Sequence, residues 1–341
     1  MLELTPANAA DYLRSRGWLD EAEARVEALG WGVSNAVLRV TTPTRAFVVK
    51  QSRPQLRTRE AWFSDIGRVF REVEVMRRLG PLLPPGTVPA VLFVDRDNYL
   101  FGMEHAPPAA AVWKERLLAG ALDPAVARQA GTVLGLIHQC SAEHPEWADD
   151  LGERTVYVQL RINPFYVTVR DRRPEVAAAV APLIAELLAA REAICHGDYT
   201  PKNILVHPPP AAGAFTLVDY ETAHYGDPAM DLGLFLAHLT LKAVRDFPRR
   251  ADFYALTETF WQAYGAVVRF RPLAALTARG VQHFAVCCLA RLDGTSPVDY
   301  LPEEPKRAAV RRFCRRILWD RPATWAETLR LVEESVAALG E

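Results

Sequence analysis

The sequence predicts an α+β protein built from two parts, a small antiparallel β lobe followed by a larger helical lobe. β-Branched runs separated by turn residues dominate residues 1–103. Apolar residues at helical spacing dominate residues 104–341. The length of 341 residues also exceeds the usual size of one hydrophobic core. We therefore expect two domains with a boundary near residue 103.

The first lobe is predicted to begin with a short helix and an antiparallel meander. Thr5 before Pro6 offers a helix N-cap followed by a proline at the first helical position. Residues 24–50 then contain three β-branched runs, which glycines and the turn at residues 41–44 separate. These runs predict three neighbouring strands.

A helix and two further strands complete the first lobe. Apolar residues recur at helical spacing over residues 65–79, which predicts a helix there. Strands are expected at residues 90–94 and 99–103, on either side of a polar turn.

The second lobe is predicted to be helical, with one β-hairpin in its middle. Asp123 and Pro124 predict the start of a helix that ends near Cys140. The hairpin strands are residues 204–207 and 215–219, joined by a turn rich in proline and alanine. Other helices are expected at residues 176–190, 229–244, 253–268, 273–289, 304–318 and 323–339.

The composition is that of an ordinary folded protein. Apolar residues make up 50% and charged residues 24% of the chain. A formal net charge of −1 creates no field that favours nucleic acid or an anionic membrane as partner. The five cysteines lack the CxxC spacing of metal or redox sites, so we expect reduced thiols. Neither a signal peptide nor a membrane-length apolar run is visible, and a cytoplasmic protein is expected.

Carboxylate and amide side chains stand at both ends of the predicted hairpin. Residues 195–203 read CHGDYTPKN before it, and residues 219–221 read DYE after it. Phosphoryl transfer needs a carboxylate for the acceptor hydroxyl and hard oxygen ligands for Mg²⁺. Asp198 can serve as the catalytic base, and Asn203 and Asp219 as metal ligands. The step of five residues from Asp198 to Asn203 matches the catalytic loop of protein kinases.

The first lobe carries residues suited to the phosphates of ATP. Lys50 ends a predicted strand, where a kinase places the lysine that contacts the α- and β-phosphates. Glu72 lies on the predicted helix and is expected to pair with Lys50, with Glu74 as the alternative. The stretch GWGVSNAV between two strands is similar to a kinase phosphate-covering loop. Its candidate nucleotide contacts are Gly30, Gly32, Ser34, Asn35 and Val37.

These motifs resemble the aminoglycoside phosphotransferase and choline kinase superfamily, which has a protein-kinase-like bilobal fold. The resemblance rests on HGDYTPKN, VDYE, GDPAMDL and REVEVMRRL, and it spans most of the chain. It implies an ATP- and Mg²⁺-dependent kinase with a small-molecule hydroxyl acceptor. By this resemblance Asp198 is the base, Asn203 and Asp219 bind the metal, and Lys50 and Glu72 form the phosphate-binding pair.

The resemblance also implies an adenine site and a structural aspartate. Asp231 is similar to the helix aspartate that braces the catalytic loop through backbone hydrogen bonds. The adenine is expected where the lobes join. Met103, Glu104 and His105 can offer backbone groups to its edge, and Val37, Val48, Leu205 and Val218 are expected to sandwich it.

A narrower resemblance is to 5-methylthioribose kinase, carried by residues 50–76 with Trp62 as its marker. In that family the HGD motif is followed by a different loop, which lacks the asparagine present here at position 203. The acceptor therefore stays open among methylthioribose, choline, homoserine, another hydroxylated metabolite and an aminoglycoside. The alternative function is a catalytically inactive nucleotide-binding module, against which the presence of Lys50, Asp198, Asn203 and Asp219 argues.

Two other segments have two interpretations each. Residues 290–297 have the polar, turn-forming composition of a loop near a substrate cleft or of a plain helix end. The segment RRFCRRIL predicts a basic patch for an anionic ligand or a solvated helix face. Its cations are Arg311, Arg312, Arg315 and Arg316, and the acids near them in sequence are Glu303, Glu304 and Asp320.

Overall fold

The computed structural model describes residues 1–30, 34–56, 62–211 and 213–340. The chain forms two compact units of mixed α and β structure. Unit 1 comprises residues 1–108 and the segment Thr216–Glu221. Unit 2 comprises Ala109–Phe215 and Thr222–Glu341. A segment from the middle of the chain therefore belongs to the unit that contains the N-terminus.

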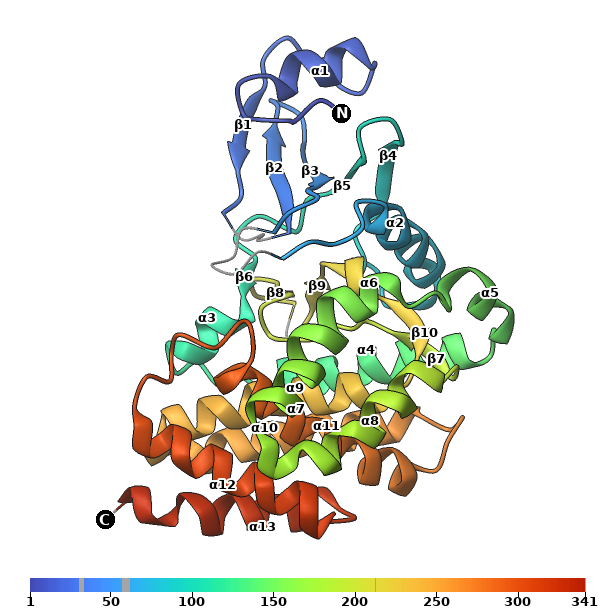
Figure 1. The fold of residues 1–341 in the computed structure, drawn as a ribbon. Helices are drawn as coiled ribbons and strands as arrows, with labels where there is room; N and C mark the ends of the chain where they lie inside the picture. The colour runs from blue at the N-terminus through green and yellow to red at the C-terminus, as the bar shows by residue number, and fades with distance from the viewer. Residues whose placement is uncertain (31–33, 57–61, 212, 341) are drawn as a thin grey trace. The chain divides into compact units, whose positions relative to one another are not determined.

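Unit 1 is built on an antiparallel sheet of five strands in the order β1-β2-β3-β5-β4 (Figure 1). The meander of three strands and the later pair agree with the sequence prediction. The strands are β1 (Arg25–Ala28), β2 (Asn35–Thr41), β3 (Ala46–Ser52), β4 (Val91–Asp95) and β5 (Leu100–Glu104).

Two helices accompany this sheet, and both begin later than predicted. Helix α1 spans Ala9–Ser15, because the Thr5 carbonyl accepts from the Asn8 and Ala9 amides in a turn before it. Helix α2 spans Arg68–Leu79, because the Asp65 side chain accepts from the Gly67 amide in another turn. A 3-10 turn at Gly80–Leu82 follows α2.

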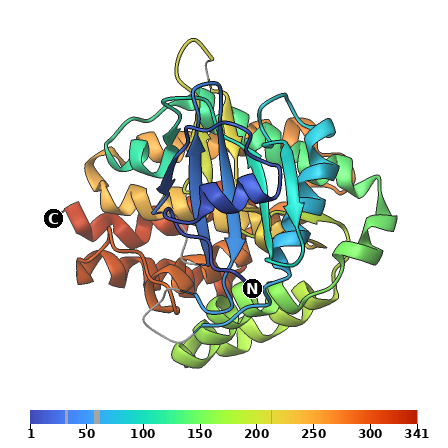
Figure 2. The ribbon, with the colours of Figure 1, turned by 90° about the horizontal axis from the view of Figure 1, so that it is seen from above.

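The two faces of the sheet have different roles. Leu38 and Val49 are paired across β2 and β3, and they belong to a core cluster with Leu13 of α1. Figure 2 shows α1 lying across the strands. Val37 and Lys50 form the neighbouring pair. Because side chains alternate along a strand, Val37 and Lys50 lie on the face that points away from α1.

Unit 2 is mainly helical. Helix α4 packs against α10, and α9 packs against α11 (Figure 1). The Asp123 side chain accepts from the Ala125 amide and caps α4 as predicted. The helices are α3 (Trp113–Leu118), α4 (Pro124–Ala142), α5 (Ala148–Leu151), α6 (Thr155–Tyr157), a π-helix (Val158–Val167), α7 (Thr168–Arg172), α8 (Ala177–Ala189), α9 (Ala229–Arg245), α10 (Arg250–Val267), α11 (Leu273–Asp293), α12 (Glu304–Asp320) and α13 (Trp325–Val336).

The short strands of the central region correct one expectation. The predicted hairpin is present as β8 (Ile204–Val206) and β9 (Phe215–Leu217), in a sheet of order β6-β8-β9 with β6 (Ala111–Val112). The expectation that one hairpin alone interrupts the helices was wrong. An antiparallel pair, β7 (Ala193–Cys195) and β10 (His224–Gly226), lies in unit 2. Strands of three residues are too short to show a period of two in the sequence.

The most apolar long helix belongs to the core of unit 2. Helix α11 has the length and hydropathy of a candidate membrane span, but 72% of its most apolar window is buried within the fold. That burial is typical of a core helix.

The arginines of α12 make contacts within unit 2. Arg311 pairs with Asp293 at 2.7 Å and with Glu304, and Arg316 pairs with Glu334 at 2.7 Å. Arg312 donates to a backbone carbonyl of α13. These contacts agree with the interpretation as a helix face.

Candidate active site

The loop that carries Asp198 is anchored by a buried aspartate on the first turn of α9. The backbone amides of His196 and Gly197 donate to the two Asp231 oxygens at 2.6 and 2.9 Å. Burial raises the pKa of Asp231, but hydrogen bonds from His138 and the loop outweigh it and hold the pKa below its usual value. The expected bracing by Asp231 is confirmed.

Gly197 is required at the tightest point of this loop. Its φ of +73° is a conformation that side-chain-bearing residues rarely adopt. A Cβ atom at this position would also lie 2.7 Å from the Thr222 carbonyl oxygen. The loop can turn toward Asp198 in this way only with glycine.

Asp198 is held by an amide and two cations, all in unit 2. The Asn203 side chain donates to the Asp198 carboxylate and to its backbone carbonyl, both at 2.9 Å. Arg161 lies 3.0 Å and Lys202 3.4 Å from the carboxylate oxygens. These contacts orient a carboxylate that can accept a proton from a hydroxyl. The amide oxygen of Asn203 is not used in its contacts with Asp198.

Arg161 is a candidate site residue that the sequence interpretation missed. It comes from the π-helix, and it also donates to the Gly197 carbonyl. The available signal was weak: one arginine inside an apolar stretch, for which no long-range partner could be assigned from spacing.

Lys50 lies between two carboxylates in unit 1. Its ammonium group is 2.7 Å from Glu72 and 2.6 Å from Asp219, and the lysine is 4% exposed. Burial lowers the pKa of Lys50, but Asp219 and Glu72 outweigh this and raise it above its ordinary value. The Lys50–Glu72 pair is confirmed, and the alternative Glu74 pairs instead with Arg78.

The segment after β9 is fixed against the same glutamate. Asp219 adopts a φ of +72°, and the amide of Tyr220 donates to Glu72 at 3.1 Å. Glu72 therefore orients both Lys50 and the segment that carries Asp219.

Glu221, whose role the sequence left open, joins three segments of unit 1. Its carboxylate accepts from the Ser34 hydroxyl at 2.6 Å and from the Asn35 amide at 2.8 Å. It also pairs at 2.8 Å with Arg68, whose side chain is completely buried. Arg68 donates further to the backbone carbonyls of Ser34 and Arg53. We call Ser34, Asn35, Arg68 and Glu221 the clasp, because they tie the start of β2 to α2 and to the segment after β9.

We expect Arg68→Met to destabilise unit 1, because Glu221 would then be a buried charge that has lost its cation. Breaking a buried pair in this way typically costs about 3–5 kcal/mol. Thermal unfolding measures the loss, and hydrogen exchange should show faster opening of β2 and β3 than of α10. Arg68→Met with Glu221→Gln removes both charges and should recover part of the stability. If the single variant unfolds like the parent chain, the clasp is not a stabilising element.

Three of the expected nucleotide contacts, Val37, Val48 and Met103, lie on one face of the sheet of unit 1. Val48 is paired with Met103 across β3 and β5, on the face that also carries Lys50. The amide of Glu104 donates to the Ala90 carbonyl at 2.9 Å, so this group is already engaged. Gly30 precedes β2, and Gly32 lies outside the described residues.

The remaining candidates lie at the edges of these elements. Val218 follows β9 in unit 1 and is partly buried. The His105 ring bonds the Ala106 carbonyl. Leu205 lies in β8 of unit 2 and is partly buried as well.

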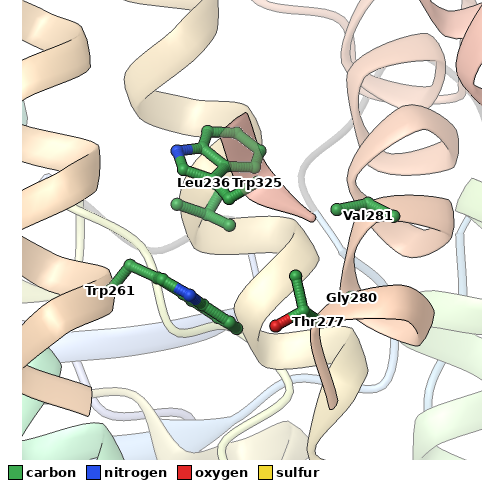
Figure 3. A pocket seen from close by; sticks show the side chains of 6 residues that line it. All are labelled: Leu236, Trp261, Thr277, Gly280, Val281 and Trp325. Carbon is green, nitrogen blue, oxygen red and sulfur yellow. The ribbon is translucent and has the colours of Figure 1, made fainter. Parts of the chain in front are cut away.

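A small apolar space in unit 2 is unrelated to these groups. Figure 3 shows its lining side chains. None of the candidate catalytic or nucleotide residues lines it. The lining residues are Leu236, Trp261, Thr277, Gly280, Val281 and Trp325.

A family comparison agrees with this constellation. The model of a phosphotransferase enzyme family matches residues 25–276, which contain every candidate catalytic, metal-binding and nucleotide-binding residue named above. The chain belongs to this family. A methylthioribose kinase of Erwinia tasmaniensis is 28% identical over 267 residues, which are 69% of this chain and 65% of that protein. The chain spans between 60% and 65% of the length of four such kinases.

Two solved structures have the same kinase-like fold. A microcompartment-associated aminopropanol kinase has a TM-score of 0.55 at 15% identity, over 92% of this chain and 99% of that one. An aminoglycoside phosphotransferase from Alicyclobacillus acidocaldarius has a TM-score of 0.51 at 15% identity, over 99% and 96% of the two chains. At this identity the likeness shows the fold alone.

Proposed function

We propose that this phosphotransferase moves the γ-phosphate of ATP to a hydroxyl of a small molecule, with Mg²⁺ as cofactor. The main support is that Lys50 is buried between Glu72 and Asp219 in unit 1. Unit 2 of the same chain holds an oriented Asp198. A buried lysine with an oriented ammonium group can position the phosphates of a nucleotide. The family match supports the same chemistry.

The chain's own residues supply the remaining steps. Asp198 accepts the proton of the acceptor hydroxyl, and Arg161 and Asn203 keep its carboxylate in place. Lys50 binds and orients the phosphates.

The donor chemistry of Asn203 in unit 2 and of Asp219 in unit 1 suits magnesium. Asn203 and Asp219 offer hard oxygens, and within the described ranges no cluster of three or more histidine, cysteine, aspartate or glutamate side chains forms a cage. Magnesium is usually held by one or two carboxylates together with substrate phosphates. When bound, the ion would neutralise charge on the transferring group.

The identity of the acceptor is best tested by measurement of ATP consumption. The purified chain, MgATP and a panel of alcohols are combined, and ADP formation is followed. The panel contains methylthioribose, choline, homoserine, an amino alcohol and several aminoglycosides. Acceptor-dependent turnover supports the proposal. Tight MgATP binding without turnover on any alcohol would favour the inactive nucleotide-binding module.

We expect Asp219→Ala to weaken MgATP binding, because a carboxylate that can hold the metal is lost. The decrease should be larger with Mg²⁺ than with excess chelator, since the metal-independent contacts remain. Calorimetry with a non-hydrolysable ATP analogue measures both affinities. The exposed Asp252→Asn change on α10 serves as the control. Equal MgATP affinity in Asp219→Ala and the parent chain would remove Asp219 from the metal site.

A further inference from the structure

Unit 2 contains a group of cations near Asp198 that the proposed reaction does not use. Lys114 lies on α3, Lys242 on α9 and Arg291 on α11, and Tyr300 lies on the loop that follows α11. Lys114 and Lys242 lie 5.8 and 5.0 Å from the centre of the Tyr300 ring. We call these four residues the cationic cluster. In Figure 1 the orange-red loop that leads into α12 lies beside α3, and Lys114 is 4.0 Å from Asp299 of that loop.

Lys242 is a buried charge that lacks a carboxylate partner. Its residue is 1% exposed, and its one hydrogen bond to a described residue goes to the His238 carbonyl one turn earlier. No carboxylate forms a salt bridge with it in the described part of the chain. Burial, together with the nearby cations Lys114 and Arg291, lowers the pKa of Lys242 to about 7. An unpaired buried cation is costly, and a buried group with a strongly shifted pKa is a candidate for a functional site.

Arg291 and Tyr300 also have unused hydrogen-bonding groups. The buried Nε of Arg291 and the buried hydroxyl of Tyr300 have no partner among the described residues. Burial lowers the pKa of Arg291, while Tyr300 and Asp198 act against this. The backbone amide of Lys114 donates to the Pro201 carbonyl at 2.9 Å, which ties the cluster to the loop that carries Asp198.

The balance of charge around the cluster is positive. Asp198 already has Arg161 and Lys202 as partners, and Asp299 is 87% exposed. Burial and the surrounding cations hold the pKa of His238 well below its ordinary value, because a further positive charge is disfavoured there. Such a site attracts an anionic group and disfavours a polycation.

We propose that Lys114, Lys242, Arg291 and Tyr300 bind an anionic group of the acceptor, so that the acceptor is an alcohol that carries a carboxylate or a phosphate ester. This inference rests on the proposed function, because it assigns the acceptor of the same reaction. The anion would supply the counter-charge that the cluster lacks. Its binding there would place the acceptor in the neighbourhood of Asp198.

Three compounds with one carbon skeleton test the charge requirement. Glycerol is neutral, glycerate carries a carboxylate and glycerol 3-phosphate carries a phosphate ester. Calorimetry with the full chain at fixed ionic strength should show that at least one anion binds about tenfold more tightly than glycerol. The anion that binds more tightly shows whether the site recognises a carboxylate or a phosphate ester. If neither anion binds more tightly than glycerol, the proposal is wrong.

Variants then assign the binding to the cluster. Lys242→Met and Arg291→Met should each weaken anion binding about tenfold, because each removes a positive charge that attracts the anion or donates a hydrogen bond to it. Lys242→Met should also raise the melting temperature, because an unpaired buried charge is replaced by an apolar side chain. The Lys114 side chain is one-third exposed, so Lys114→Met should keep the fold while it removes one cation of the cluster. Arg316→Met on α12 removes the same net charge elsewhere and should change neither measurement. If all cluster variants bind like the parent chain, the cluster is structural.

Saturation with MgADP separates the acceptor from the nucleotide. Anion binding that persists in the presence of MgADP supports an acceptor site. Anion binding that MgADP abolishes would assign these cations to the nucleotide phosphates and overturn the proposal.

The two proposals can fail separately. Turnover on neutral alcohols without anion binding would leave the kinase function intact and remove the anionic acceptor. Anion binding that depends on Lys242 and Arg291, without turnover on any alcohol, would leave the site intact and remove the kinase function.

Discussion

Asp198→Asn is expected to reduce phosphoryl transfer by roughly 10²- to 10⁴-fold, the usual contribution of a positioned general base. Asparagine has nearly the same shape, and its oxygen can still accept from Asn203 as the carboxylate does. It cannot take the proton of the acceptor hydroxyl. The braced loop should remain folded, because Asp231 holds the backbone of His196 and Gly197 independently of this side chain.

Steady-state kinetics with the acceptor found by the screen measure this effect on kcat. Calorimetry with MgATP should give an affinity near that of the parent chain, because the base contacts the acceptor. Asp252→Asn is again the matched control. An Asp198→Asn enzyme with nearly unchanged kcat would show that another group removes the proton.

Lys50→Met is expected to abolish most activity and to destabilise unit 1. The activity falls because an oriented cation is lost from the phosphates, an effect of roughly 10²–10³-fold for one preorganised donor. The stability falls because Glu72 and Asp219 become neighbouring carboxylates without the ammonium between them. Burial already raises the pKa of Glu72, and loss of Lys50 would raise this pKa further.

The double variant Lys50→Met with Glu72→Gln separates these two effects. It removes one cation and one anion, so the melting temperature should recover toward that of the parent chain. Activity should stay low, because the phosphate contact is still missing. If the double variant recovered both stability and activity, Lys50 would be a structural residue only.

The elements with a long periodic pattern were predicted well from the sequence. Helices α4, α9 and α12 follow runs in which apolar residues recur over several turns, and β2 and β3 follow alternating runs. The π-helix and the β7–β10 pair were missed. The π-helix does not follow the period of 3.6 residues, and strands of three residues contain too few positions for a pattern.

The candidate site could be predicted where a motif fixes the spacing, and not where the partners are distant. Asp198 and Asn203 lie five residues apart, and the Lys50–Glu72 pair follows from a strand and a helix in a known order. Arg68 and Glu221 are 153 residues apart, and Arg161 is 37 residues before Asp198. A single arginine or glutamate in a sequence does not indicate which distant charge it meets, because that depends on the packed fold.

The membership of Thr216–Glu221 in unit 1 affects the order in which the chain can fold during synthesis. Residues 1–108 leave the ribosome before Asp219 and Glu221 exist, so Lys50 at first has Glu72 alone and Arg68 has no carboxylate to pair with. Domains near the N-terminus usually fold first during translation. Here the N-terminal unit begins first and is completed only after Phe215 has been made, so a fragment that stops at Pro108 lacks the anions that its buried cations need.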